Sequence, residues 1–216
     1  MNFDRYGRVE RIHNLTLVNA DCMQILKDLP DNYADLACVD PPYGINANQM
    51  NMGSRATVKP NKKKWDETPP SEEYFRELQR ISSNQIIWGG NYFRSIWPTR
   101  GFLVWDKGET MKGRSFAECE QAWTSFDVSA RIYKQSPNDA TRIHPTQKPV
   151  KLYDWLLSNY SEPGQRILDT HLGSGSSAIA AHYFGCEFVG IELDEDYYKA
   201  AVQRITEQTR QLDLLA

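Results

Sequence analysis

The chain has 216 residues, a length that suits one domain of ordinary size. With 40% hydrophobic and 12% aromatic residues it can bury a sizeable core, which excludes a disordered or collagen-like protein. Its 25 Lys and Arg residues against 28 Asp and Glu residues give a net charge of −3, which excludes a uniformly basic nucleic-acid coat but not a basic face. No segment approaches the ~18 apolar residues of a membrane span, and the charged N-terminus lacks the apolar stretch of a signal peptide. We therefore expect a cytoplasmic protein without membrane contact.

Strand and helix patterns alternate along the chain. In chain order, strands are expected at 15–20, 34–40, 85–90, 101–105, 166–169 and 188–192. Helices are expected at 21–30, 71–82, 150–160, 177–184 and 194–212, the last with Asp194 as its N-cap. This alternation predicts an α/β fold with a mostly parallel sheet covered on both faces. The cysteines at 22, 38, 119 and 186 lack paired or zinc-binding spacing, so we expect reduced thiols and no metal site.

Charge is distributed unevenly along the chain. The 44–70 segment has a net charge of +3, because Arg55, Lys59, Lys62, Lys63 and Lys64 face only two acidic residues. The 131–151 segment has five basic residues against one acidic residue, for +4, whereas 187–198 has five acidic residues and no basic one. Both positive segments are expected to be loops, and basic loops beside an active site suit a polyanion. Taken alone, each loop is equally well explained as solvated surface.

The first motif that indicates chemistry runs from Asp169 to Ala178, where an expected strand meets a helix. Gly173 and Gly175 allow a sharp turn and a close approach to a ligand, and the helix start offers free N–H groups. Glu192 ends the next strand, where it can accept hydrogen bonds from ribose hydroxyls. This pattern indicates a nucleoside-cofactor crevice. On its own it also fits a dinucleotide fingerprint, and therefore an NAD-linked oxidoreductase, or a tight turn that binds nothing.

The second motif, Asp40-Pro41-Pro42-Tyr43, directly follows an expected strand. The prolines hold the backbone extended and remove N–H donors, so the Asp40 carboxylate and the Pro41 carbonyl can both accept hydrogen bonds. An exocyclic amine on a planar base needs two acceptors for its two N–H groups and an aromatic face for stacking. The carboxyl end of the strand is also where α/β folds bind ligands. The motif therefore predicts an amine-binding site with Asp40, Pro41, Pro42 and Tyr43 as its residues.

Together with a third motif, His144-Pro-Thr-Gln-Lys148-Pro149, and in this order, these segments resemble the amino-methylating DNA methyltransferases that use S-adenosylmethionine. The catalytic motif precedes the cofactor motif, as in the permuted β group of that family. The resemblance implies a Rossmann-like, seven-stranded, mostly parallel sheet with helices on both faces, in one catalytic domain spanning 1–216. It further implies double-stranded DNA as partner, a homodimer, S-adenosylhomocysteine as product and no metal. Asp-Pro-Pro-Tyr is more typical of adenine N6 enzymes than of cytosine N4 enzymes.

Site residues follow from the resemblance position by position. It implies that the cofactor contacts Asp21, Cys22, Asp40, His144, Thr146, Lys148, Asp169, Gly173, Gly175 and Glu192. Asp21 would meet the adenine ring of the cofactor, and the alternative is that it serves only as a helix N-cap. For His144 and Lys148 the alternative is a proline-pinned loop with a solvated lysine. The basic residues of a flexible 44–70 loop would contact DNA phosphates.

The chain departs from the family at two places. Thr170-His171 replaces the usual Pro-Phe. His171 could either replace the Phe as a flat ring or weaken binding of the cofactor or the base, and it is not expected to be a general base. Only the short 127–143 interval stands where relatives carry a target-recognition region. Sequence reading is therefore expected to be minimal, to come from the 44–70 loop, or to be supplied by a second subunit. Three alternatives therefore stay open: a cytosine N4 enzyme, an enzyme acting on RNA adenine, and an inactive DNA-binding subunit. The length of the chain favours an orphan enzyme over a restriction-system partner.

Overall fold

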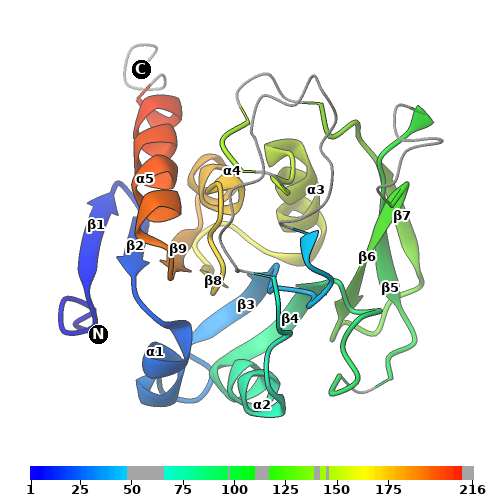
Figure 1. Ribbon diagram of the computed structural model, residues 1–216, viewed down its shortest axis with the longest axis horizontal. Helices are drawn as coiled ribbons and strands as arrows, with labels where there is room; N and C mark the ends of the chain where they lie inside the picture. The colour runs from blue at the N-terminus through cyan, green and yellow to red at the C-terminus, as the bar shows by residue number, and fades with distance from the viewer. Residues whose placement is uncertain (48–65, 97, 110–116, 139–141, 145, 211–216) are drawn as a thin grey trace.

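The computed structural model describes residues 1–47, 66–96, 98–109, 117–138, 142–144 and 146–210, which form one mixed sheet and five helices (Figure 1). The strands are β1 (Arg8–Ile12), β2 (Leu15–Asn19), β3 (Ala34–Val39), β4 (Ser82–Trp88), β5 (Phe102–Asp106), β6 (Cys119–Thr124), β7 (Arg131–Lys134), β8 (Arg166–Asp169) and β9 (Glu187–Glu192). The helices are α1 (Cys22–Asp28), α2 (Glu72–Ile81), α3 (Val150–Tyr160), α4 (Ser176–Phe184) and α5 (Glu195–Thr209).

The strand order in the sheet is β1-β2-β9-β8-β3-β4-β6-β5-β7. Neighbours from β2 through β9, β8 and β3 to β4 pair in parallel, β6 runs antiparallel to both β4 and β5, and β7 pairs in parallel with β5. The sheet is therefore mostly parallel, and the predicted α/β class is confirmed. The predicted number of seven strands is too low for the described residues, because β1 and β7 each add a strand at an outer edge.

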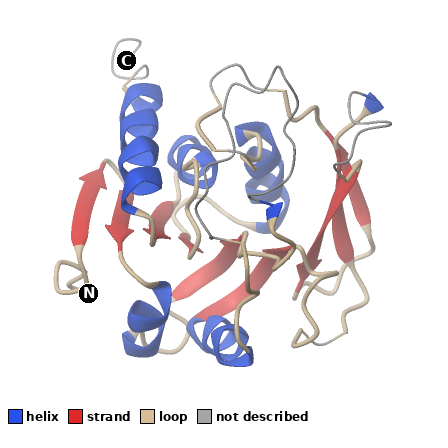
Figure 2. Cartoon of the chain, viewed as in Figure 1, coloured by secondary structure: helices blue, strands red, loops and turns tan. Residues whose placement is uncertain are grey.

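Helices cover both faces of the sheet (Figure 2). The sheet therefore divides the core into two halves. Helices α3, α4 and α5 pack on one face, where Leu156, Ile179 and Tyr198 are fully buried. Helices α1 and α2 pack on the other face around Leu26 and Leu78. Because parallel strands buried on both faces need apolar side chains in both directions, β3 and β9 have nearly continuous buried runs.

The helix starts are fixed by local hydrogen bonds that the sequence pattern anticipated. The Asp194 carboxylate accepts the N–H groups of Asp196 and Tyr197 at the start of α5, and Asp21 caps α1 through the N–H of Met23. Helix α4 starts instead at Gly175, whose φ of 76° lies in the left-handed region. A Cβ there would come within 2.7 Å of Ile205, so this turn needs glycine both for its conformation and for its packing.

Three strands escape the sequence patterns. The short strands β1 and β7 contain no buried residue, and β6 lacks a clean alternation of apolar and polar residues. The expectation that 131–151 is a loop is wrong for its first four residues, which form β7. Its last two residues belong to the helix expected at 150–160, which is α3. The described part of α5 ends at Thr209, three residues before the predicted end. Across the described residues, no helix is long and apolar enough to cross a membrane, and all four cysteines are free thiols.

Candidate active site

A cavity of about 980 Å³ opens at the edge of the sheet where most of the parallel strands end. Its wall includes the residues that follow β2, β3, β4, β8 and β9, and the segment that leads into α3. The predicted residues that line it are Asp21, Cys22, Asp40, Pro41, Pro42, Tyr43, His144, Thr146, Lys148, Gly173 and Glu192. The fold therefore brings three motifs, the first of which lies about a hundred residues before the other two, to one site.

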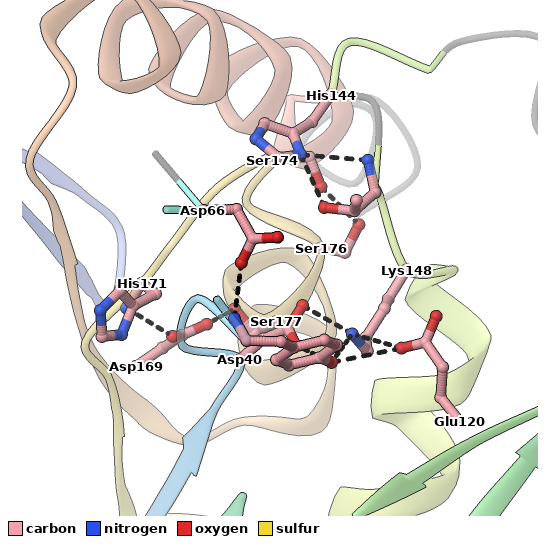
Figure 3. A network of polar contacts seen from close by, with 12 residues as sticks. Asp40, Asp66, Glu120, His144, Lys148, Asp169, His171, Ser174, Ser176 and Ser177 are labelled. Atoms are coloured by element: carbon pink, nitrogen blue, oxygen red, sulfur yellow. Dashed lines mark hydrogen bonds and ion pairs between the residues drawn. The ribbon is translucent and has the colours of Figure 1, made fainter. Parts of the chain in front are cut away.

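Asp169 and Gly175 are the two predicted cofactor residues that lie behind the cavity wall rather than in it. Asp169 is 1% exposed, and its carboxylate accepts the Ser177 hydroxyl at 2.6 Å and the backbone N–H of His171 at 3.0 Å (Figure 3). Burial raises the pKa of Asp169 to about 7, although these two hydrogen bonds oppose the shift. Asp169 therefore shapes the turn after β8 and places a carboxylate close behind the wall.

Glu192 ends β9 and holds two stretches of backbone together. One carboxylate oxygen accepts the N–H of Gly173 at 2.9 Å, and the other accepts the N–H of Asp194 at 2.9 Å. Burial raises the pKa of Glu192, and these backbone hydrogen bonds oppose the shift. Each oxygen keeps a second lone pair that a ligand hydroxyl in the cavity could use.

His144 lies over the same part of the cavity. Its ring packs on Tyr197 with centroids 4.3 Å apart, and its Nδ1 is 3.2 Å from the hydroxyl of Thr146 (Figure 3). Burial, helped by the positive charge of Lys148, lowers the pKa of His144 to about 4. The imidazole is therefore neutral near pH 7 and offers the cavity a ring edge rather than a charge.

The Asp40-Pro41-Pro42-Tyr43 turn places a carboxylate and an aromatic ring side by side. The Tyr43 hydroxyl donates to Asp40 Oδ1 at 2.6 Å. The Tyr43 ring stacks on Tyr92, with centroids 4.9 Å apart and an interplanar angle of 14°. Tyr92 is 41% exposed and also lines the cavity, so it extends the aromatic surface that Tyr43 was expected to provide alone.

Asp40 belongs to a network of four charged side chains, of which Asp40, Lys148 and Glu120 are drawn in Figure 3. Lys148 Nζ is 2.6 Å from Asp40 Oδ2 and 2.9 Å from Glu120 Oε2, and Lys107 Nζ is 2.6 Å from Glu120 Oε1. Burial raises the pKa of Asp40 and Lys148 opposes that shift, whereas at Glu120 the two lysines outweigh burial and lower the pKa to about 2. Lys148, predicted to cover the cofactor, is thus bound to the catalytic motif.

Asp66 secures the backbone of the same turn. Its side chain is buried, and its carboxylate accepts the N–H groups of Tyr43 at 2.6 Å, Gly44 at 3.0 Å and Ala47 at 2.8 Å. Three N–H donors to one carboxylate make a strong local clamp. The clamp fixes the direction in which Tyr43 leaves the turn.

The Thr170-His171 departure is accommodated by a polar chain behind the cavity. The buried Tyr74 hydroxyl lies 2.6 Å from Thr170 Oγ1, which in turn lies 2.9 Å from His171 Nδ1. The His171 ring packs edge-on against Tyr74, and burial lowers its pKa to about 4. His171 is therefore a neutral, flat ring near pH 7, and it lines the cavity.

The predicted DNA-contacting residues Arg55, Lys59, Lys62, Lys63 and Lys64 lie outside the described residues. The described residues contain no cluster of three His, Cys, Asp or Glu side chains placed to hold a metal ion.

A family model of DNA methylases, N6_N4_Mtase, matches residues 89–203, which is more than half of the chain. The chain belongs to this DNA methylase family. Two relatives are similar in sequence to this chain over nearly their full lengths. YubD of Escherichia coli (strain K12), which is named as a methylase, is 28% identical over 87% of this chain and 88% of its own. The type II methyltransferase M2.DpnII of Streptococcus pneumoniae is 23% identical over 89% of this chain and 90% of its own.

Solved structures share the fold of this DNA methylase. The M1.HpyAVI–SAM complex superposes with a TM-score of 0.61 at 19% identity, covering 88% of this chain and 98% of that one. The cytosine-N4-specific PvuII DNA methyltransferase superposes with a TM-score of 0.59 at 12% identity, covering 95% and 93%. The resemblance to the Rossmann-like DNA methyltransferases is therefore confirmed. Neighbours this distant show the fold and leave the target base open.

The sequence analysis missed Glu120, Lys107, Tyr92 and Asp66. Glu120 is the second residue of β6, which runs antiparallel to β4 and therefore begins at the active edge. Lys107 follows β5, which runs in the same direction as β4 and ends at that edge. No local pattern marks either residue. Asp66 and Tyr92 had weak signals, an acidic residue ending a basic segment and an aromatic residue two positions after the Gly-Gly that ends an expected strand.

Proposed function

We propose that this DNA methylase transfers a methyl group from S-adenosylmethionine to the N6 amine of an adenine in double-stranded DNA. The observation that carries the proposal is the partly buried Asp40 carboxylate, which stands beside an aromatic pair on the wall of the same cavity as the Gly173–Glu192 turn. The choice of adenine rests on Asp40 as the first residue of the motif, the form typical of N6 enzymes.

The chemistry of the cavity suits S-adenosylmethionine, which brings a methyl group on a positively charged sulfonium sulfur. Asp21, Glu192, Asp194 and Glu195 line the end of the cavity around Gly173, and Asp169 lies close behind it. Burial without a cationic partner among the described residues disfavours the ionised forms of Asp169 and Glu192, so a cationic ligand would relieve that cost. Glu192 would accept the ribose hydroxyls, as the sequence analysis expects.

At the other end of the cavity, Asp40 would activate the amine. The lone pair of an exocyclic amine is conjugated into the ring, so the nitrogen is a poor nucleophile. An N–H hydrogen bond to the Asp40 carboxylate favours the tetrahedral nitrogen and stabilises the positive charge that builds on it during attack. A nitrogen–carbon bond forms as the sulfur–carbon bond breaks, and the nitrogen then gives up one proton, for which Asp40 is the adjacent acceptor.

The target base would have to leave the DNA stack to reach Asp40, because the carboxylate lies inside the cavity. The Tyr43–Tyr92 pair offers an aromatic surface for it, and base–aromatic stacking contributes about 1–3 kcal/mol. Orientation of the amine against the methyl group would supply much of the rate enhancement. The basic residues of the 44–70 segment remain the proposed phosphate contacts.

The test uses purified protein, S-adenosylmethionine and unmethylated duplex DNA of mixed sequence. After the reaction, the DNA is digested to nucleosides and analysed by mass spectrometry, with the Asp40→Asn variant as the matched control. We expect N6-methyladenine with the wild-type protein and none above background with the variant. Detection of N4-methylcytosine in place of N6-methyladenine would show that the acceptor is cytosine and not adenine. Cofactor binding without any methylated base in DNA or RNA would identify an inactive subunit.

A further inference from the structure

Lys148 is buried and has more hydrogen-bond partners than a lysine in a solvated loop would have. Its side chain is 3% exposed, and its ammonium group reaches Asp40 Oδ2 at 2.6 Å, Glu120 Oε2 at 2.9 Å and the Tyr43 hydroxyl at 3.3 Å. An ammonium group has three N–H donors, and three oxygens surround this one. The Trp88 ring lies 5.1 Å from Nζ and closes another side. Lys148 is therefore held in one place and points at the catalytic carboxylate (Figure 3).

Glu120 is the residue that anchors this lysine. It receives Lys148 on one oxygen and Lys107 on the other, so its charge is shared between two cations. The four charged groups sum to zero, which is the condition under which buried charges are tolerated. Glu120 comes from β6 and Lys107 from the end of β5, so the part of the sheet farthest from the Gly173–Glu192 turn determines where Lys148 sits.

We propose that Lys148 and Glu120 are positioning residues for methyl transfer: Lys148, anchored by Glu120, fixes the orientation of the Asp40 carboxylate and keeps it ionised for the incoming amine. This inference rests on the proposed function, in which Asp40 accepts the amine. It gives Lys148 a different task from the cofactor contact that the family resemblance implies.

The two residues act on Asp40 in opposite directions. Burial raises the pKa of Asp40, Lys148 lowers it, and the negative charge of Glu120 raises it. Removing the lysine should therefore make Asp40 harder to ionise, whereas removing the glutamate should make it easier. A purely structural role predicts no such opposite pair of shifts.

Several other groups face Asp40 and stay in place in these variants. From the elements packed around it they are Cys38 on β3, Tyr43 in the turn, Tyr74 on α2, Tyr153 on α3 and Asp169 on β8. Burial raises the pKa of Cys38 and of the three tyrosines well above their usual values, so these four are neutral near pH 7. Asp169, with a pKa of about 7, is the one member of this set that titrates near neutrality, and its contribution is common to all the variants.

The experiment measures the single-turnover rate of methyl transfer against pH for Lys148→Met and Glu120→Gln. We expect the acidic limb of the profile to move to higher pH by about one unit or more in Lys148→Met, and to lower pH in Glu120→Gln. Rates at the optimum should fall about a hundredfold and about tenfold, respectively. The affinity for S-adenosylmethionine, measured by calorimetry, should stay within about threefold of wild type in both.

Matched controls and a second variant keep the test decisive. Lys151→Met and Glu118→Gln remove exposed charges close by in the chain and should leave the profile unchanged. The double variant Lys148→Met/Glu120→Gln removes one charge of each sign, so the acidic limb of its pH profile should lie between those of the single variants. It also keeps the test usable if one single variant folds poorly. Lys148→Arg should recover part of the lost rate.

The outcomes separate this inference from the proposed function. If the wild-type protein transfers no methyl group, the proposed function fails. If the wild type is active and the two limbs move together or not at all, the positioning role is wrong. A loss of cofactor affinity greater than tenfold in Lys148→Met, with an unmoved limb, would return Lys148 to the cofactor site.

Discussion

The two ends of the cavity hold partly or fully buried carboxylates in opposite electrostatic settings. At the end where we propose that the amine binds, Asp40 and Glu120 are paired with lysines at 2.6 to 2.9 Å. At the end where we propose that the cofactor binds, Asp169 and Glu192 accept only neutral hydroxyl and backbone N–H donors, with no cationic partner among the residues that the structure describes. The end around Asp40 and Glu120 is therefore neutral as a group and is called the neutral end, and the end around Asp169 and Glu192 is called the acidic end.

This difference matches the charges of the proposed ligands. A sulfonium cofactor brings a positive charge that the acidic end lacks, whereas the target amine is neutral and acquires positive charge only during the reaction. A carboxylate that is already paired with an ammonium group does not move to pair with the cofactor. Because its orientation is fixed, it does not have to reorient when positive charge develops on the amine. The comparison indicates that cofactor binding and amine activation are assigned to different ends of the cavity, because lysine counter-ions are present at one end and absent from the described residues at the other.

The largest expected effect comes from removing the acceptor at the neutral end. In Asp40→Ala, we expect methyl transfer to fall about a thousandfold or more, because the developing charge on the amine loses its nearest anion. The affinity for the cofactor should change by no more than about threefold, since the acidic end is untouched. Single-turnover assays and calorimetry measure the two quantities. Asp127→Ala, which removes an exposed carboxylate, is the control.

Methyl transfer at a near-normal rate in Asp40→Ala would show that the amine is activated elsewhere. A large loss of cofactor affinity in the same variant would show instead that the two ends are not independent.

The sequence predicts the acidic end better than the neutral end, for a physical reason. Asp169, Gly173 and Glu192 lie on one continuous strand–turn–helix–strand unit, so their spacing along the chain reports their proximity in space. The neutral end is assembled from segments whose contacts are set by strand order. Lys148 and Asp40 lie 108 residues apart, and Glu120 joins them only because β6 is inserted, reversed, between β4 and β5.

The same reason explains the strands that were missed. The buried strands β3, β8 and β9 have apolar runs that reflect cover on both faces, whereas β1 and β7 lie at the edges of the sheet and need little apolar surface. Strand β7 has the pattern of a basic loop because Arg131, Ile132 and Lys134 are exposed. Edge strands are held by backbone hydrogen bonds, which leave no compositional signal.

A second, smaller effect probes the acidic end. In Glu192→Gln, we expect the dissociation constant of S-adenosylmethionine to rise about ten- to a hundredfold, the equivalent of about 1.5–3 kcal/mol for a hydrogen bond to a charged group. The rate at saturating cofactor should stay close to wild type. Calorimetry and a cofactor titration of the rate measure both. Glu187→Gln, at the exposed opposite end of β9, should change neither. Unchanged affinity in Glu192→Gln would remove Glu192 from the ribose site.

The smallest expected effect is a pH dependence that belongs to the acidic end alone. Burial raises the pKa of Asp169 to about 7, so its carboxyl group is neutral below that pH and ionised above it. A cationic ligand favours the ionised form, and cofactor affinity should therefore rise about tenfold between about pH 5.5 and about pH 7.5. His144 and His171, with pKa values of about 4, do not titrate in this window. Asp169→Asn should flatten the dependence, and calorimetry near pH 6.5 should detect proton release on binding to wild type only; equal release from both proteins would assign the proton to another group.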